Sequence, residues 1–229
     1  MIVPLALPLA EQFTVWLPDL PGHGDSPPTR GERPGLWETL DVLKRWLRGL
    51  PDGIDVLLGH SLGAWLAQEL LRSGELRPRA AVLLAPLAGD REPARVRPRA
   101  RPARRRAGRA DGLAELLAHV ESEIAGELPA AFVKTVTRAL VRPLSDYPEL
   151  LDELTEELEK PMRPFDPRCP VLVLGGELDR TTTPDAVERV ARAIAGSEIA
   201  ILDGMGHYPF VESESGVADV IRAFLDRVA

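Results

Sequence analysis

Short apolar runs alternate with longer amphipathic stretches along this 229-residue chain, and that alternation restricts its fold more than any other feature. The runs are continuously apolar, which is typical of strands covered on both faces. Five runs predict strands, at 13–17, 54–58, 80–85, 171–175 and 198–202. Helical patterns lie between or after them, at 36–50, 61–74, 183–196 and 215–229. Strand and helix in repetition predict a three-layer α/β fold, with a mostly parallel sheet of about five strands.

One interval interrupts this alternation. The strands predicted at 80–85 and 171–175 are separated by a distance along the chain far beyond an ordinary connection. Helical patterns recur inside it, near 111–125, 130–141 and 146–160. We therefore predict a helical cap over residues 88–165, inserted into a core formed by residues 1–87 and 166–229.

The predicted cap begins with an arginine- and proline-rich run, residues 91–109, which holds nine arginines and one glutamate. A solvated linker is the favoured interpretation of such a composition. The alternative is a patch that binds anions, and compositional bias alone is a third reading. No aromatic residue interleaves the arginines to stack on bases, which argues against nucleic acid.

Composition restricts the class of protein and its surroundings. The 45% hydrophobic content suits one domain with a sizeable core, and the net charge of −7 argues against a dedicated nucleic-acid binder. The single cysteine, Cys169, allows no intramolecular disulfide, which fits a reducing cytosol. The first ten residues lack a basic segment, and no apolar run has the length of a membrane span. We predict a cytoplasmic protein without a nucleic-acid or membrane partner, and the sequence leaves its oligomeric state open.

The stretch "GHSLG" at 59–63 carries the strongest chemical signal, because it follows a predicted strand and opens a predicted helix. A serine on such a sharp turn is held in a strained conformation above the carboxyl end of the sheet. Gly59 and Gly63 are expected to let the backbone pack closely around Ser61. The N–H of Leu62, at the start of the helix, is expected to face a developing oxyanion.

A serine hydroxyl needs a base, and His207 is the predicted one. It lies in the glycine-bracketed loop "DGMGHYPF", directly after the last predicted strand and therefore at the same sheet edge as Ser61. His60 adjoins Ser61 but points elsewhere on a sharp turn, and His23 lies in "PDLPGHGDS" after the first predicted strand. We expect His60, His23 and Trp65 to support the site or line its pocket.

The base needs a carboxylate to orient its ring. The loop "LGGELDRTTTP" follows the strand predicted at 171–175 and offers Glu177 and Asp179. Asp179 is preferred because it lies further from the strand end and has more room to reach outward, and Glu177 remains the alternative. The predicted order along the chain is Ser61, Asp179, His207, each after its own strand.

These four motifs, "PDLPGHGDS", "GHSLG", "GELD" and "GMGHYPF", occur in the order found in the α/β-hydrolase family, which the chain resembles over 13–85 and 171–229. The resemblance implies a serine that attacks a carbonyl, a histidine that moves the proton and an acid that orients the histidine. Those roles fall to Ser61, His207 and Asp179.

The resemblance is incomplete at the N-terminus. The family has strands before the one that ends in "PDLPGHG", and a His-Gly loop that supplies a second oxyanion N–H; neither has a counterpart here. Two explanations stay open: the chain is a fragment, or the strand predicted at 13–17 shifts to pair directly beside 54–58. Losing one oxyanion donor costs on the order of 100- to 1,000-fold in rate.

The sequence thus predicts a serine hydrolase that cleaves a carboxylic ester or thioester of a small acyl substrate through an acyl-enzyme. No cluster of metal ligands is visible, and no cofactor is implied. Two alternatives remain: a lyase, transferase or cofactor-free peroxidase-like enzyme on the same fold, and a weakly active or non-catalytic protein.

Overall fold

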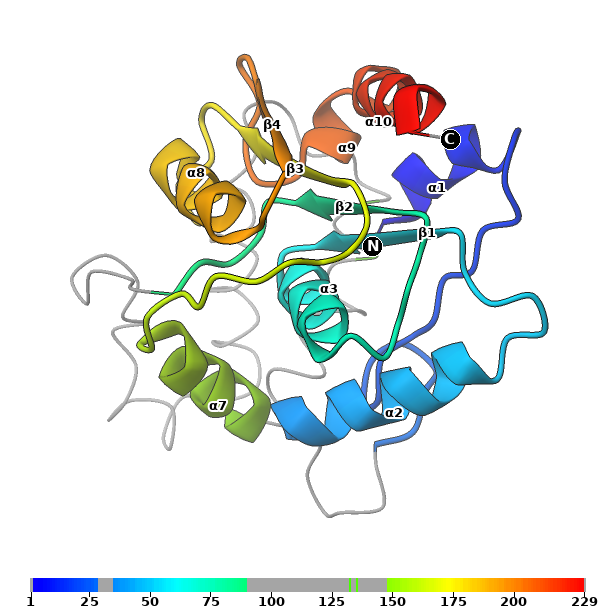
Figure 1. Ribbon diagram of the computed structural model, residues 1–229, viewed down its shortest axis with the longest axis vertical. Helices are drawn as coiled ribbons and strands as arrows, with labels where there is room; N and C mark the ends of the chain where they lie inside the picture. The colour runs from blue at the N-terminus through cyan, green and yellow to red at the C-terminus, as the bar shows by residue number, and fades with distance from the viewer. Residues whose placement is uncertain (1, 29–34, 90–131, 133–134, 136–147, 229) are drawn as a thin grey trace.

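The computed structural model describes residues 2–28, 35–89, 132, 135 and 148–228, and its centre is a four-stranded parallel sheet (Figure 1). The strands follow one another in the order β1-β2-β3-β4. Each strand coincides with a predicted apolar run, within two residues at either end, and their bounds are β1 Val56–His60, β2 Ala80–Leu84, β3 Val171–Gly176 and β4 Glu198–Leu202. The α/β class and the parallel sheet are therefore confirmed.

The predicted strand at 13–17 is wrong. In the part of the chain that the structure describes, this segment joins no sheet, and β1 pairs with β2 alone. Phe13 and Val15 are partly buried against the core, whereas Trp16 is 55% exposed and its ring meets the edge of Trp46 at 6.4 Å. Part of this run is thus buried without a strand partner, and the segment does not shift beside 54–58 as one explanation required.

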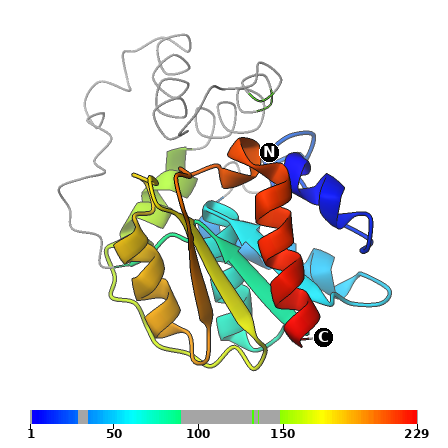
Figure 2. The ribbon, with the colours of Figure 1, turned by 90° about the horizontal axis from the view of Figure 1, so that it is seen from above.

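Helices cover both faces of the sheet, so that the fold has three layers, as Figure 2 shows for α8 and α10 on opposite sides of β3 and β4. Helices α1, α9 and α10 pack on the face that presents Val82 and Leu172, and α3 and α8 pack on the face that presents Leu83 and Val173. The helix bounds are α1 Val3–Leu9, α2 Leu36–Arg48, α3 Leu62–Ser73, α7 Pro148–Leu158, α8 Pro184–Ala193, α9 Pro209–Glu212 and α10 Glu214–Val228.

Burial along the strands follows their place in the sheet. Every residue of β2 and β3 is buried, whereas β1 and β4 are only partly buried. The two central strands are the continuous apolar runs expected between two layers of helices. Their carboxyl ends form the edge at which the candidate site is built.

Helix ends agree with the sequence in part. Gly74, the last residue of the helical pattern at 61–74, ends α3 in the left-handed conformation, with φ of +67°. Helix α8 begins at Pro184 after Thr183, but it ends at Ala193, three residues before the helical pattern at 183–196 ends. Ile194 has already turned to extended backbone there and forms a bridge with Phe165, which ends the helix early.

Within the predicted cap, α7 confirms the helix expected at 146–160. It lies beside α2 (Figure 1), and the Glu153 carboxylate accepts a hydrogen bond of 2.7 Å from the N–H of Leu36. Gly35 precedes that helix and leaves room, since a Cβ there would stand 2.8 Å from the same carboxylate. A residue 117 positions away thus takes the part of an N-cap.

The remainder of the predicted cap, with the helices expected near 111–125 and 130–141 and the arginine-rich run 91–109, lies outside the described residues, apart from Phe132 and Thr135. The division of the chain at 88–165 stays a prediction. No helix among the described residues is long and apolar enough to cross a membrane.

Candidate active site

Three loops at the carboxyl ends of β1, β3 and β4 bring the predicted site residues together. Ser61 directly follows β1, Asp179 follows β3, and His207 follows β4. Parallel strands end at one edge of a sheet, which is where open α/β sheets bind their ligands. The site is therefore assembled by topology from residues up to 146 positions apart.

Ser61 stands on a strained turn between β1 and α3, as the sequence predicted. Its φ of +52° and ψ of −115° lie in a region that side chains rarely adopt. Its N–H donates to the carbonyl of Leu84 at 3.0 Å, which ties the turn to the neighbouring strand β2. The strain is held in place by this pairing and by the helix that begins at the next residue.

The two glycines of "GHSLG" differ in what the turn demands of them. A Cβ on Gly59 would lie 2.3 Å from the carbonyl oxygen of Gly63, so that only glycine permits this close approach. A Cβ on Gly63 would meet nothing within 4 Å. The expected packing role is confirmed for Gly59 and does not hold for Gly63.

His207 spans the serine and the aspartate. Its Nε2 lies 3.1 Å from Ser61 Oγ, and its Nδ1 lies 2.8 Å from Asp179 Oδ2. Because a carboxylate can only accept, Nδ1 carries the proton, and Nε2 is left to accept the proton of the serine hydroxyl. The side chains of His207 and Asp179 are 4% and 0% exposed, so that bulk water does not compete for their hydrogen bond.

The Asp179 carboxylate is held from its other oxygen. Oδ1 accepts hydrogen bonds from the backbone N–H groups of Thr181 and Thr182, at 2.8 and 2.7 Å. The Thr182 hydroxyl in turn donates to the carbonyl of Ala85, just after β2, at 3.3 Å. These contacts fix the orientation of the acid and tie its loop to the adjacent strand.

Glu177, the alternative acid, makes a different contact. Its Oε2 accepts a hydrogen bond of 2.9 Å from the N–H of Gly204, at an exposed position in the same loop as His207. Glu177 therefore holds the backbone at the start of that loop, whereas Asp179 is hydrogen-bonded to the imidazole itself. The geometry therefore favours the preferred acid of the sequence analysis.

Leu62 is the first residue of α3, and its N–H is one of the N–H groups that a helix start leaves without an intrahelical partner. It follows the serine directly, at the positive end of a 12-residue helix. That place suits an oxyanion donor, and the role of the Leu62 N–H stays a prediction. A second donor is not identified among the described residues.

The remaining candidates, His60, His23 and Trp65, make different contacts. His60 donates from Nε2 to the backbone carbonyl of His207 at 2.8 Å. His23 contacts the carbonyl of Pro21 at 3.1 Å, and burial lowers the pKa of its imidazole. Trp65 packs in the apolar cluster between α2 and α3, with its ring 5.5 Å from Trp37. Trp65 contacts the serine residue through its backbone, since its N–H donates to the Ser61 carbonyl at 3.0 Å.

Two residues near the site were not predicted from the sequence. Glu212, in the last position of α9, accepts a hydrogen bond of 2.8 Å from the N–H of Gly206, next to His207. The ring of Tyr208 makes edge-to-face contacts with the His207 ring, at 5.0 Å between centroids, and with the ring of Phe132, from the predicted cap, at 5.5 Å. The only sequence signal was their nearness to the histidine in "GMGHYPFVE", since neither belongs to a catalytic pattern.

The described residues hold no group of three or more histidine, cysteine or carboxylate side chains that could bind a metal ion. The arrangement that is present is a hydroxyl, an imidazole and a carboxylate in a hydrogen-bonded row. Such a row can move a proton from the hydroxyl and hold the resulting imidazolium. Such a row is chemically suited to nucleophilic attack by the hydroxyl oxygen.

Comparison with known proteins agrees with the α/β fold. A family model described as "Alpha/beta hydrolase family" matches residues 2–220. A comparison with curated protein sequences found no match.

Solved structures share the fold over nearly the whole chain. An esterase from Thermogutta terrifontis is 22% identical, with a TM-score of 0.71, and the match covers 99% of this chain and 84% of the esterase. A hydrolase from Pseudomonas aeruginosa is 21% identical, with a TM-score of 0.72 over 98% and 84%. A 2-hydroxy-6-oxo-6-phenylhexa-2,4-dienoate hydrolase from a Rhodococcus strain is 22% identical, with a TM-score of 0.75 over 97% and 83%. At such identities the likeness concerns the fold.

Proposed function

Because the chain belongs to the alpha/beta hydrolase family, we propose that it is a serine hydrolase that cleaves a carboxylic ester or thioester through an acyl-enzyme. The observation that carries the proposal is the continuous row from Ser61 Oγ through the His207 ring to Asp179 Oδ2, with separations of 3.1 and 2.8 Å. Both distances are within hydrogen-bond reach of the atoms that must exchange a proton.

The reaction has two halves. In the first, Ser61 Oγ attacks the acyl carbon while its proton passes to His207 Nε2, and the same proton then goes to the departing alcohol or thiol. In the second, water gives its proton to Nε2 and attacks the acyl-serine, and that proton returns to Ser61 Oγ as the acid leaves. Asp179 keeps Nδ1 protonated and the ring aligned throughout.

Charge on the acyl oxygen develops beside the start of α3. The Leu62 N–H is the donor proposed to receive it, aided by the positive end of the helix. One such donor is worth on the order of 100- to 1,000-fold in rate. The second donor of the hole is left unassigned.

An apolar acyl group is the proposed substrate class. The neighbours of the histidine are aromatic, since Tyr208 and Phe132 are 6% and 5% exposed and pack against each other beside the His207 ring. A thermophilic esterase is among the proteins with this fold, which is consistent with an ester but does not select one.

The test is labelling with a fluorophosphonate probe, which reacts with an activated serine. We expect the wild-type protein to be labelled and Ser61→Ala to remain unlabelled, with both proteins folded and monodisperse. A folded wild-type protein that takes up no probe contradicts the proposal.

The identity of the acid is tested by a matched pair of variants. Asp179→Asn removes the carboxylate that meets the ring and is expected to slow labelling by about 10⁴-fold, because the imidazole loses its tautomer and orientation. Glu177→Gln removes a carboxylate from the exposed brace at Gly204 and should slow it by less than about tenfold. Collapse of labelling in Glu177→Gln alone would reverse the assignment.

A further inference from the structure

His60 occupies a position in which an apolar residue would be expected. It is the last residue of β1, and strand alternation puts its side chain on the same face as Val56 and Leu58. That face packs on the cluster formed with α1, α9 and α10. His60 is only 9% exposed there, so that a polar ring has been placed at the edge of an apolar core.

Aromatic rings surround the imidazole of His60. The ring of Phe210 lies 4.9 Å away and edge-on, Tyr208 lies 5.4 Å away, and His207 lies 5.0 Å away. Burial, with a smaller contribution from the nearby His207, lowers the pKa of His60 to about 3. The ring is therefore neutral at ordinary pH and puts no positive charge beside the imidazolium that His207 would become.

A single strong contact offsets the cost of burying this ring. His60 Nε2 lies 2.8 Å from the backbone carbonyl oxygen of His207. Because a carbonyl can only accept, Nε2 carries the proton, which fixes the tautomer of His60. The hydrogen bond crosses from the end of β1 to the loop after β4, over 147 positions of sequence.

We propose that His60 is a positioning residue that holds the main chain of residue 207, so that the His207 ring stays in line between Ser61 and Asp179. This inference rests on the proposed function and adds a role for a residue that does not itself touch the reacting atoms. Its basis is that two hydrogen bonds join the same two places. Neighbouring residues 60 and 61 each contact residue 207, one at its carbonyl and one at its ring.

Other hydrogen bonds hold the two residues that precede His207 in this loop. The carbonyl of Met205 accepts from the N–H of Leu178 at 2.8 Å, and the N–H of Gly206 donates to Glu212 at 2.8 Å. These contacts fix the chain before the histidine, and His60 fixes the histidine residue itself. A displacement of about 1 Å at a catalytic group can cost on the order of 100-fold in rate, which is the scale of effect to expect.

The test compares two replacements of His60. His60→Leu fills a similar volume and suits the apolar face, but it cannot donate, whereas the side-chain amide of His60→Gln can reach the carbonyl as Nε2 does. With p-nitrophenyl butyrate as substrate, we expect His60→Leu to lower kcat by about 10- to 100-fold with KM within about threefold of wild type. His60→Gln should retain kcat within about threefold. Equal losses in the two variants, or an unchanged kcat in His60→Leu, would overturn the proposal.

A second measurement does not depend on activity. The proton on His207 Nδ1, bonded to Asp179, gives a far-downfield proton NMR signal in a well-ordered pair. We expect that signal in wild type and His60→Gln and its loss or broadening in His60→Leu, at a temperature where circular dichroism shows all three folded. If His60→Leu does not fold, His60→Asn takes its place, since its amide is too short to reach the carbonyl.

The two arms separate this inference from the proposed function. A wild-type protein that shows the NMR signal but takes up no fluorophosphonate contradicts the hydrolase and leaves the role of His60 to be read from the variants. A signal that is the same in wild type, His60→Gln and His60→Leu overturns the positioning role, whatever the activity.

Discussion

His60 also makes the stability of the protein depend on pH in a way that can be calculated. The perturbation is mild acid, from about pH 8 to about pH 5. Burial holds the pKa of His60 at about 3 in the folded protein, against the ordinary histidine value of 6.5. Over this range the unfolded chain takes up a proton at residue 60 that the folded chain refuses, so stability is lost as the pH falls.

The magnitude follows from the two pKa values. At about pH 5, with 6.5 for the unfolded and about 3 for the folded protein, proton uptake by residue 60 favours the unfolded state by about 2 kcal/mol. The loss begins below the unfolded value of 6.5 and grows until the pH approaches 3. For a chain of this size, 2 kcal/mol corresponds to a fall of roughly 4–8 °C in Tm.

The assay is urea unfolding of wild type and His60→Gln at both pH values and one ionic strength. All other titrating groups are common to the two proteins, so they cancel in the difference. We expect wild type to lose about 2 kcal/mol more than His60→Gln between about pH 8 and about pH 5. Ser61→Ala keeps His60 and should follow wild type. If wild type and His60→Gln lose stability in parallel, His60 is not a buried neutral group and the reasoning fails.

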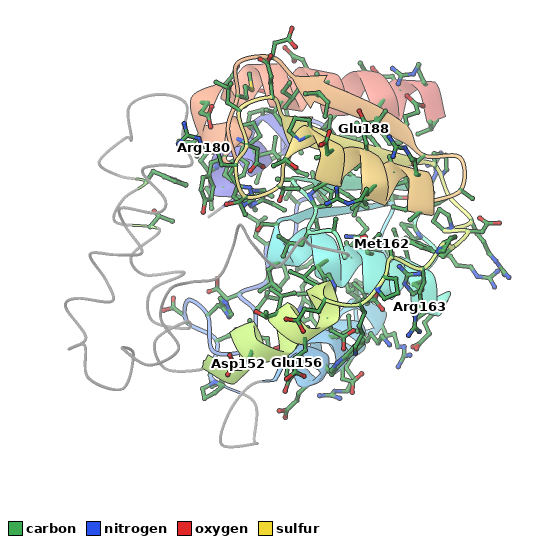
Figure 3. The ribbon with its side chains drawn as sticks, turned by 90° about the vertical axis from the view of Figure 1, so that its left-hand side faces the viewer. Asp152, Glu156, Met162, Arg163, Arg180 and Glu188 are labelled. Atoms are coloured by element: carbon green, nitrogen blue, oxygen red, sulfur yellow. The ribbon has the colours of Figure 1, made fainter. Side chains whose placement is uncertain are left out.

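Two further predictions concern single contacts. Gly59→Ala should lower the free energy of unfolding by roughly 2–4 kcal/mol and abolish most probe labelling, because its Cβ collides with the backbone at Gly63. Gly63→Ala meets nothing and sits in a helix, so it should raise stability by roughly 0.5–1 kcal/mol; a loss as large as that of Gly59→Ala would contradict the distinction. Glu153→Ala removes the hydrogen bond to the Leu36 N–H and should cost about 1 kcal/mol by urea unfolding. Glu156→Ala, at an exposed place one turn further along α7 (Figure 3), is the control and should stay within about 0.5 kcal/mol.

The predictions from sequence succeeded where local pattern and physics coincide. The apolar runs at 80–85 and 171–175 became the central strands because nothing but a two-sided interior can bury runs of that kind. The turn at Ser61 could be placed because the close backbone approach at this turn requires a glycine at position 59, and that glycine can be read directly from the sequence. The order of serine, aspartate and histidine followed from each being next to a strand end.

The failures came where an apolar pattern had more than one way to be buried. The run at 13–17 has the composition of a strand, but a strand also needs a partner with free backbone groups in register. Phe13 and Val15 pack on the core without a partner strand, and the ring of Trp16 contacts Trp46 of α2. The sequence could not distinguish a paired strand from an unpaired segment packed on the core, because both arrangements can bury the same hydrophobic side chains.

The sequence by itself therefore determined the α/β class, the strand-to-helix turn at Ser61 and the loops that carry Asp179 and His207. Only the tertiary structure decided which carboxylate meets the imidazole, because Asp179 and Glu177 lie two residues apart and differ only in where the folded loop aims them. It also decided that His60 reaches the histidine loop, a contact between segments 147 positions apart. Short-range pattern sets the elements, and hydrogen bonds between distant segments, which no local pattern encodes, set the site.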